Sequence, residues 1–279
     1  MKLLVTGAAG LVGGAIARRA TELGHEVIRV WNSAPIPALP GAHDLRCDLE
    51  NPSAVSSLPT DVSAVIHAAA RVPAGNWPDD AAGSANRRAD DALLHQYRAF
   101  GGAWVYVSSV ALEVPEVRRT SSYAREKAAT EENVTLAFSG RARSLRISSP
   151  YGPGMRHLNV LRRFVEAARA GGPITIFGSG ERTQDFIHVD DVATAAIAAA
   201  EVPGGAPVVV ASGEPVTMTQ LARLIVQIAG SSSPINYLDR PDPQERFRAD
   251  YDLGPAFDAL GWTPSIRLEI GLRSLVEAM

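Results

Sequence analysis

Alternation of apolar strand-like segments with helical segments is the feature that most constrains how this chain folds. Short apolar segments fall at residues 2–6, 26–31, 65–67, 104–108 and 144–147. Helical segments lie between them, at residues 15–23, 79–100 and 122–138. Such alternation requires right-handed crossovers between parallel strands. The sequence therefore predicts an α/β fold, a doubly wound parallel sheet with helices on both faces.

The composition is that of a folded protein whose partners are small molecules. Of 279 residues, 46% are apolar and 20% charged, which is ordinary for a globular chain. A net charge of −3 gives no general attraction to nucleic acid or to an anionic membrane. The single cysteine, Cys47, excludes an internal disulfide framework and a multi-cysteine zinc site, so no metal is expected. No secretory signal precedes Gly7, and we expect a cytoplasmic protein.

A glycine-rich turn follows the first strand. Residues 6–13 read TGAAGLVG, so that glycines recur at every third position. Glycine permits a tight turn and lets backbone N–H groups approach a pyrophosphate at the start of a helix. The spacing departs from the G-x-G-x-x-G pattern, and by itself it also fits a purely structural turn. Its place after a buried strand predicts a Rossmann-type dinucleotide site, with contacts from Gly7, Ala9, Gly10, Leu11, Val12 and Gly13.

The end of the second strand normally distinguishes NAD from NADP. An acid about 20 residues beyond the glycine turn binds the ribose 2′-hydroxyl of NAD, whereas an arginine accommodates the 2′-phosphate of NADP. Here the chain reads Val30-Trp31-Asn32-Ser33, without a carboxylate and without an arginine. Asn32 and Ser33 can hydrogen-bond to either cofactor. NAD or NADP is therefore expected, with NAD as the first choice.

A tyrosine and a lysine lie one helical turn apart in the third helical segment. Tyr123 and Lys127 should project from the same helix face. A neighbouring cation favours phenolate and lowers the tyrosine pKa from about 10, which makes the phenol a general acid/base. The same spacing is common on solvated helix faces. Ser108 and Ser109 favour the catalytic interpretation, because they end a strand at the edge where open α/β sheets bind ligands.

Several ordered motifs together resemble the extended short-chain dehydrogenase/reductase family. In the first half these are the glycine turn, Asp48-Leu49, His67-Ala68-Ala69-Ala70, Asn86, Ser108-Ser109 and Tyr123-x-x-x-Lys127. In the second half, residues 146–154, 177–192 and 260–262 resemble the NAD-dependent epimerase/dehydratase branch, whose usual substrates are nucleotide sugars. The resemblance extends from residue 2 nearly to the C-terminus.

The resemblance implies a role for each matching residue. Tyr123 would be the acid/base, and Lys127 would tune it and bind the nicotinamide ribose. Ser109 would hydrogen-bond the reacting hydroxyl, with Ser108 as the alternative. The remaining cofactor contacts that it implies are Asp48, Leu49, Ala68, Ala69, Ala70, Asn86, Pro150 and Tyr151. The first two would meet the adenine, and the last two would lie on the nicotinamide side; Asp48 also fits a turn-capping aspartate.

Departures from the family pattern concern the substrate. The segment between Ser109 and Tyr123 is short, and in the family this segment helps to shape the sugar pocket. Gln184 stands where relatives carry an arginine, with Arg182 two residues earlier, and Arg246 lies where the family places a second diphosphate arginine. We therefore predict substrate contacts from Ser109, Arg182, Gln184 and Arg246. For the arginines, a solvated surface is the alternative.

The chemistry that the resemblance implies is hydride transfer between a secondary alcohol and a nicotinamide. The first expectation is a nucleotide-sugar 4-epimerase similar to UDP-glucose 4-epimerase, and the second is an NADPH-dependent nucleotide-sugar 4-ketoreductase. A 4,6-dehydratase fits less well, because Val110 and Ala111 offer no acid/base pair for loss of water. A cofactor-sensing protein without activity would have the same fold, but the intact Ser109, Tyr123 and Lys127 argue against it.

The sequence also predicts the division of the chain. We expect a dinucleotide-binding domain over residues 1–148, completed by part of 186–212. A smaller C-terminal substrate-binding lobe over residues 149–279 would be interleaved with it, because glycine and proline clusters break up the elements beyond residue 148. The resemblance further implies a homodimer that pairs through the helix bearing Tyr123 and the long helix before it.

Overall fold

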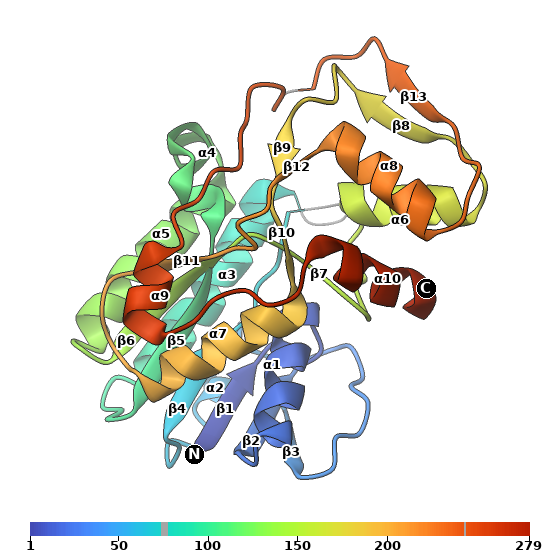
Figure 1. Ribbon diagram of the computed structural model, residues 1–279. Helices are drawn as coiled ribbons and strands as arrows, with labels where there is room; N and C mark the ends of the chain where they lie inside the picture. The colour runs from blue at the N-terminus through green and yellow to red at the C-terminus, as the bar shows by residue number, and fades with distance from the viewer. Residues whose placement is uncertain (74–77, 243) are drawn as a thin grey trace. The chain divides into compact units, whose positions relative to one another are not determined.

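The computed structural model describes residues 1–73, 78–242 and 244–279 (Figure 1). These residues form two compact units. The first unit contains Met1–Ile147, Val189–Val210 and Leu253–Thr263. The second contains Ser148–His188, Ala211–Asp252 and Pro264–Met279. Across the described ranges, no helix has both the length and the apolar character needed to span a membrane.

Seven parallel strands in the described residues form the central sheet of the first unit, in the order β11-β6-β5-β4-β1-β2-β3. The strands are β1 (Lys2–Thr6), β2 (Glu26–Trp31), β3 (Ala42–Arg46), β4 (Ala64–His67), β5 (Ala103–Ser109), β6 (Ala142–Ile147) and β11 (Val208–Val210). The strand order reverses between β1 and β4, which is the point where open α/β sheets bind ligands. The predicted doubly wound parallel sheet is confirmed.

Helices pack in pairs on the two faces of this sheet (Figure 1). Helix α1 (Leu11–Glu22) packs with α7 (Val189–Glu201), and α3 (Asp79–Gln96) packs with α5 (Ser122–Ala137). Because α7 is rich in alanine and buried along most of its length, it lies close to the sheet. The shorter helical elements of this unit are α2 (Pro52–Val55), η1 (Val110–Glu113), α4 (Pro115–Thr120) and α9 (Gly254–Leu260).

The second unit is built from short strand pairs and three longer helices. Its strands are β7 (Ser149–Tyr151), β8 (Ile174–Phe177), β9 (Thr183–Gln184), β10 (Phe186–His188), β12 (Val216–Thr217) and β13 (Ile235–Leu238). Its helices are α6 (Val160–Arg169), α8 (Met218–Ile228) and α10 (Leu268–Ala278). The buried Asp185 carboxylate fixes its loops, because it accepts hydrogen bonds from the Ser148 hydroxyl and from the backbone N–H groups of Ser212 and Gly213.

Aromatic rings fill the core between the sheet of the first unit and helices α3 and α5. Trp104, 1% exposed, stacks on Phe138 with ring centroids 4.5 Å apart. Tyr97 meets the Trp104 ring edge-on, at 5.6 Å. Burial of rings of this size is a large apolar contribution to folding.

We expect Trp104→Ala to lower the free energy of unfolding by about 3–5 kcal/mol, because it leaves a cavity beside Phe138. Trp104→Phe should cost much less, since the Trp104 indole N–H has no hydrogen-bond partner in the described residues. Chemical denaturation followed by circular dichroism measures both values. Equal losses in the two variants would show that ring burial is not the cause.

Candidate functional site

The glycine turn between β1 and α1 has no room for side chains at two of its positions. Gly7 has φ +71°, and a β-carbon on it would lie 2.7 Å from the Ala69 backbone. A β-carbon on Gly13 would lie 2.4 Å from the carbonyl oxygen of Gly7. The turn is closed by a 2.8 Å hydrogen bond from Gly10 N to Gly7 O. Only glycine fits at positions 7 and 13.

The first turn of α1 offers free backbone donors. Gly10 is its N-cap residue and caps no N–H group with a side chain, and no acidic residue lies in the first turn. Unpaired N–H groups and the helix dipole make such a terminus a site for a phosphate anion. The buried Ser108 hydroxyl, at the end of β5, also has no hydrogen-bond partner in the described part of the chain. These groups fit a dinucleotide with its pyrophosphate on the turn.

The predicted catalytic residues lie together at the end of β5 and the start of α5. Lys127 is 3% exposed, and its ammonium group donates to the Val107 carbonyl at 2.8 Å. The Lys127 Nζ atom lies 6.0 Å from the ring centroid of Tyr123 and 4.4 Å from that of Tyr106. Ser109, on the last position of β5, accepts a hydrogen bond from the Ala111 backbone at 3.1 Å.

The pKa of Tyr123 is shifted in the direction opposite to the one expected from the sequence. Burial raises the pKa of Tyr123 to about 12, the Asp90 carboxylate adds to the rise, and the Ser109 hydroxyl opposes it. Burial lowers the pKa of Lys127 to about 8, and the negative charges of the Asp90 and Glu131 carboxylates oppose this decrease. The expectation that Lys127 lowers the Tyr123 pKa is wrong for this arrangement, because desolvation dominates. Tyr123 therefore carries its proton at neutral pH.

A buried carboxylate lies between the glycine turn and the catalytic helix. Asp90 of α3 is 3% exposed, and its Oδ1 atom lies 2.7 Å from His67 Nε2. The other ring nitrogen of His67 lies 2.7 Å from the Thr6 hydroxyl oxygen, which accepts a hydrogen bond from Ala69 N at 3.2 Å. His67 is thus a packed, hydrogen-bonded residue that ties Asp90 to the residue preceding the glycine turn.

The second oxygen of Asp90 faces the catalytic side. It accepts hydrogen bonds from the Thr130 hydroxyl of α5 at 2.6 Å and from the Tyr106 hydroxyl at 3.2 Å. Burial alone would raise the pKa of Asp90, but the hydrogen bond and charge of His67 and the charge of Lys127 hold it below its ordinary value. Asp90 therefore stays ionised and supplies a negative charge beside Lys127.

Asp79, at the start of α3, fixes the first turn of α5. Its carboxylate accepts from the Ser121 hydroxyl at 2.7 Å, from Ser122 N at 2.5 Å and from Tyr123 N at 3.2 Å. Neither Asp79 nor Asp90 was predicted from the sequence. Their spacing contained the signal, because residues 79, 86 and 90 recur at intervals of seven and four and so share one face of α3.

Asn32, Ser33 and Asn86 were also predicted to contact the cofactor, and their side chains have different surroundings. Asn32 donates to Asp48 Oδ1 at 3.1 Å, and Ser33 is exposed. Asn86 bonds the backbone of Arg71 at both its N–H and its carbonyl, which fixes the chain at Arg71. The roles of these residues and of Leu49 stay predictions.

Two predicted contacts of the nicotinamide side belong to the second unit. Pro150 and Tyr151 lie on β7, beside β10. The Tyr151 side chain is fully buried, and its hydroxyl donates to the Leu268 carbonyl at 3.4 Å. Their contact with the cofactor stays a prediction, and the buried Tyr151 ring leaves only its backbone for it.

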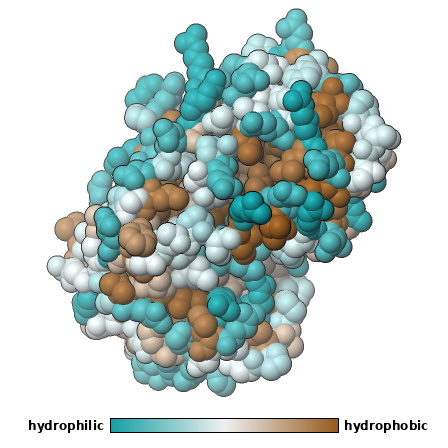
Figure 2. All heavy atoms as spheres, viewed as in Figure 1, coloured by the Kyte–Doolittle hydropathy of each residue, from teal (hydrophilic) through white to brown (hydrophobic). Residues whose placement is uncertain are grey.

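A cavity of about 660 Å³ lies within the second unit. Its lining is mainly apolar, and Figure 2 shows brown surface gathered over this part of the chain. The apolar lining residues are Leu158, Val160, Phe164, Ala167, Pro173, Ile174, Ile176, Phe177 and Met218. The polar ones are Asn159, Arg163, Glu166, Thr175, Arg182 and Asp242.

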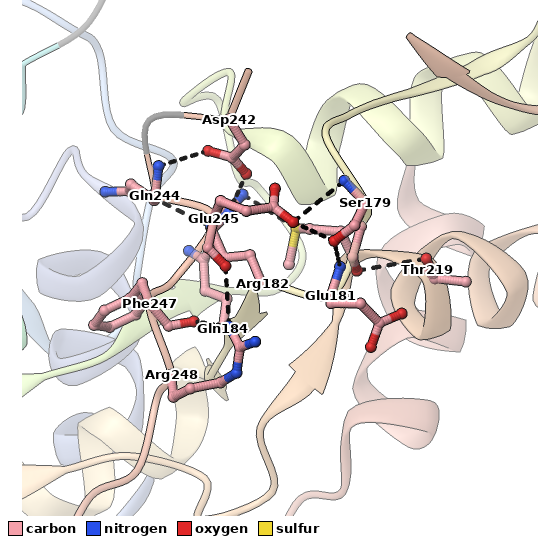
Figure 3. Close-up of polar contacts among 12 residues, drawn as sticks. Ser179, Glu181, Arg182, Gln184, Thr219, Asp242, Gln244, Glu245, Phe247 and Arg248 are labelled. Carbon is pink, nitrogen blue, oxygen red and sulfur yellow. Dashed lines mark hydrogen bonds and ion pairs between the residues drawn. The ribbon is translucent and has the colours of Figure 1, made fainter. Parts of the chain in front are cut away.

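Arg182 is the predicted substrate residue that lines this cavity, but its charge is already paired (Figure 3). Its Nε atom lies 2.7 Å from Asp242 Oδ2, and Nη1 donates to Gln184 Oε1 at 3.0 Å. Gln184 donates in turn to the Ser149 hydroxyl at 2.5 Å. Arg246 is exposed and lies outside the cavity lining. The structure thus joins Arg182 and Gln184 by a hydrogen bond.

Arg240 is a cation of this unit that the sequence analysis did not single out. Its guanidinium carbon lies 5.0 Å from the ring centroid of Phe177, which lines the cavity. Within the described ranges no carboxylate pairs with Arg240, in contrast to Arg182. Arg240 lies two residues beyond the last residue of β13, and this position after a strand could have indicated a candidate ligand contact.

Comparison with known proteins identifies the family. The model of the NAD dependent epimerase/dehydratase family matches residues 3–211. The chain belongs to this family. It is therefore an enzyme, and the family description agrees with the predicted nicotinamide cofactor, NAD or NADP.

Individual members of the family are similar over their whole length. A 2-alkyl-3-oxoalkanoate reductase of Stenotrophomonas maltophilia is 29% identical, over 99% of this chain and 98% of the relative. The crystal structure of UDP-glucose 4-epimerase from Thermotoga maritima with UDP-glucose superposes with a TM-score of 0.88 at 25% identity, over 100% and 98% of the two chains. The Thermus thermophilus UDP-glucose 4-epimerase, crystallised with NAD, gives 0.85 at 26% identity, over the same shares.

We expect Asp90→Asn to shift the pH dependence of NADH binding toward lower pH. Asp90 favours the charged form of Lys127, so its removal should move the loss of the ammonium from about pH 8 downward by about one pH unit. Titration of NADH fluorescence across pH measures the midpoint of this change.

Thr130→Val is the matched control, because it removes a hydrogen bond to the same carboxylate and keeps the charge. It should lower the thermal midpoint without moving the pH midpoint. If Asp90→Asn only lowers the thermal midpoint as well, Asp90 is structural and has no effect on the charge of Lys127.

Proposed function

We propose that this enzyme oxidises and reduces a secondary alcohol carbon of a nucleotide sugar, most simply as a 4-epimerase. The observation that carries the proposal is the set formed by Tyr123, Lys127 and Ser109 at the end of β5, beside a turn that fits a pyrophosphate. The full-length similarity to UDP-glucose 4-epimerases supports the sugar nucleotide as the substrate class.

The catalytic residues have separate tasks in this reaction. When bound, NAD supplies an acceptor and a donor for the hydride of the alcohol carbon. The phenolate form of Tyr123 takes the hydroxyl proton during oxidation, and the resulting phenol returns it during reduction. Ser109 holds the same oxygen by a hydrogen bond. Lys127 keeps a positive charge within reach of the phenol, and its bond to the Val107 carbonyl fixes the direction of the ammonium group.

The second unit would bind the nucleotide portion of the substrate. Its cavity of about 660 Å³ has the volume and apolar lining of a small-molecule site. We assign the phosphate contact there to Arg240, because Arg182 is neutralised by Asp242. This differs from the sequence-based assignment to Arg182 and Arg246.

A 4-ketoreductase is the second candidate, and one observation favours it. With a pKa of about 12, Tyr123 holds its proton at neutral pH. A protonated phenol is prepared to donate to the oxygen of a ketone as it is reduced. A reductase uses only this direction, whereas an epimerase also needs the phenolate.

Purified protein incubated with UDP-, GDP- and dTDP-sugars distinguishes the candidates. Interconversion of two sugars without net change of cofactor, followed by mass spectrometry and chromatography, supports the epimerase. Stoichiometric consumption of NADPH with a keto-sugar supports the reductase. If no sugar nucleotide of the panel reacts in either assay, the substrate class is wrong.

In the active assay, Tyr123→Phe should reduce kcat by about 10²–10⁴-fold, because the proton then has no carrier. The dissociation constant for NADH should change little. Tyr97→Phe is the control: it also removes a buried phenol hydroxyl, which bonds the Pro59 carbonyl away from the catalytic residues. Comparable rates in the two variants would exclude Tyr123 as the acid/base.

A further inference from the structure

The end of β2 in this chain has no acid to bind the 2′-hydroxyl of NAD. Strand β2 finishes at Trp31, and Asn32 and Ser33 follow it. In dinucleotide-binding folds, a carboxylate at this point selects NAD, because it hydrogen-bonds the hydroxyl and repels a phosphate. In this chain no carboxylate follows β2, so none there can bind the hydroxyl or repel a phosphate.

The neighbouring strand brings an arginine to the same point. β2 and β3 run parallel, and in their last register pair Trp31 lies opposite Arg46. The two residues are 15 positions apart in the sequence, so an inspection of the residues after β2 does not reveal Arg46. The residues that follow β2 contain no arginine, and Arg46 reaches this point from β3.

Contacts with β2 hold the Arg46 side chain at this place. Its Nε atom donates to the carbonyl oxygen of Asn32 at 3.0 Å. Its guanidinium carbon lies 5.8 Å from the ring centroid of Trp31, over the ring. The residue is exposed, so a ligand can reach it. The side chain is thus directed along the end of β2.

The terminal nitrogens of Arg46 are available to an anion. Only Nε is used in the contact with Asn32. In the part of the chain that the structure describes, no carboxylate forms an ion pair with Arg46. A guanidinium presents its donors in a planar fork that matches the oxygens of a phosphate.

The acid nearest to this point is already engaged. Asp48 Oδ1 accepts hydrogen bonds from Asn32 Nδ2 at 3.1 Å and from Glu50 N at 3.2 Å. The side-chain amide of Asn32 therefore donates to this exposed carboxylate, and the backbone carbonyl of Asn32 accepts from Arg46.

We propose that the ends of β2 and β3 form a binding site for the 2′-phosphate of NADP(H), in which Arg46 selects NADP(H) over NAD(H). The proposal rests on the dinucleotide site alone and not on the identity of the sugar. It bears on the second candidate of the proposed function, because the 4-ketoreductase would use NADPH.

Binding measurements on the full chain test this without a substrate. Isothermal titration calorimetry with NADPH and NADH should give a lower dissociation constant for NADPH. Adenosine 2′,5′-bisphosphate and adenosine 5′-monophosphate, used in the same way, isolate the contribution of the 2′-phosphate from that of the nicotinamide.

Arg46→Gln should weaken NADPH and adenosine 2′,5′-bisphosphate by about tenfold or more, because a charge-assisted contact is lost. The dissociation constant for NADH should stay within about threefold. Arg98→Gln is the control, since it removes an exposed arginine just beyond α3 whose side chain bonds only His95 among the described residues. The thermal midpoint of each variant shows that it is folded.

Asn32→Asp is the converse variant. It restores the acid at the end of β2, and it should weaken NADPH and strengthen NADH. The proposal is overturned if the wild-type protein binds NADH as tightly as NADPH, or if Arg46→Gln weakens the two cofactors equally. The dissociation constants of the cofactors do not depend on whether the enzyme turns over a sugar. The proposed function and this proposal can therefore be disproved independently of each other.

Discussion

In a parallel sheet the carboxyl ends of all strands lie at the same edge. This constraint determines where the candidate site residues of the first unit lie. β1 ends at the glycine turn, β4 at His67, and β5 at Ser108 and Ser109. β2 and β3 end beside each other at Trp31 and Arg46. Groups that are up to a hundred residues apart in the sequence are therefore delivered to one edge, where helix α1 also presents its free N–H groups.

The buried Asp90 carboxylate links the glycine turn to helix α5 and strand β5. Through His67 and Thr6 it reaches the glycine turn, through Thr130 it reaches α5, and through Tyr106 it reaches β5. A buried charge is tolerated only when it is fully paired and hydrogen-bonded. Both oxygens of Asp90 meet this requirement. Helix α3 thus supports the proposed catalytic residues of α5, Tyr123 and Lys127.

The sequence predicted what depends on local pattern and missed what depends on pairing between distant segments. β1 and β2 have the predicted bounds, because their apolar runs are bounded by clear turn residues. The Tyr123 pKa was predicted in the wrong direction, since spacing shows the neighbouring cation but not the burial. Arg182 was read as a free cation, because its partner Asp242 lies 60 residues away. Arg46 was overlooked for the same reason.

The division of the chain between the two units has a consequence for synthesis. The sheet of the first unit gains its edge strand β11 and its covering helix α7 only after residues 148–188 have been made. Until then β6 has an unpaired edge, and one face of β4 and β5 lies bare. On the ribosome, the nascent N-terminal half therefore exposes surface that attracts other chains, and its completion waits for long-range closure.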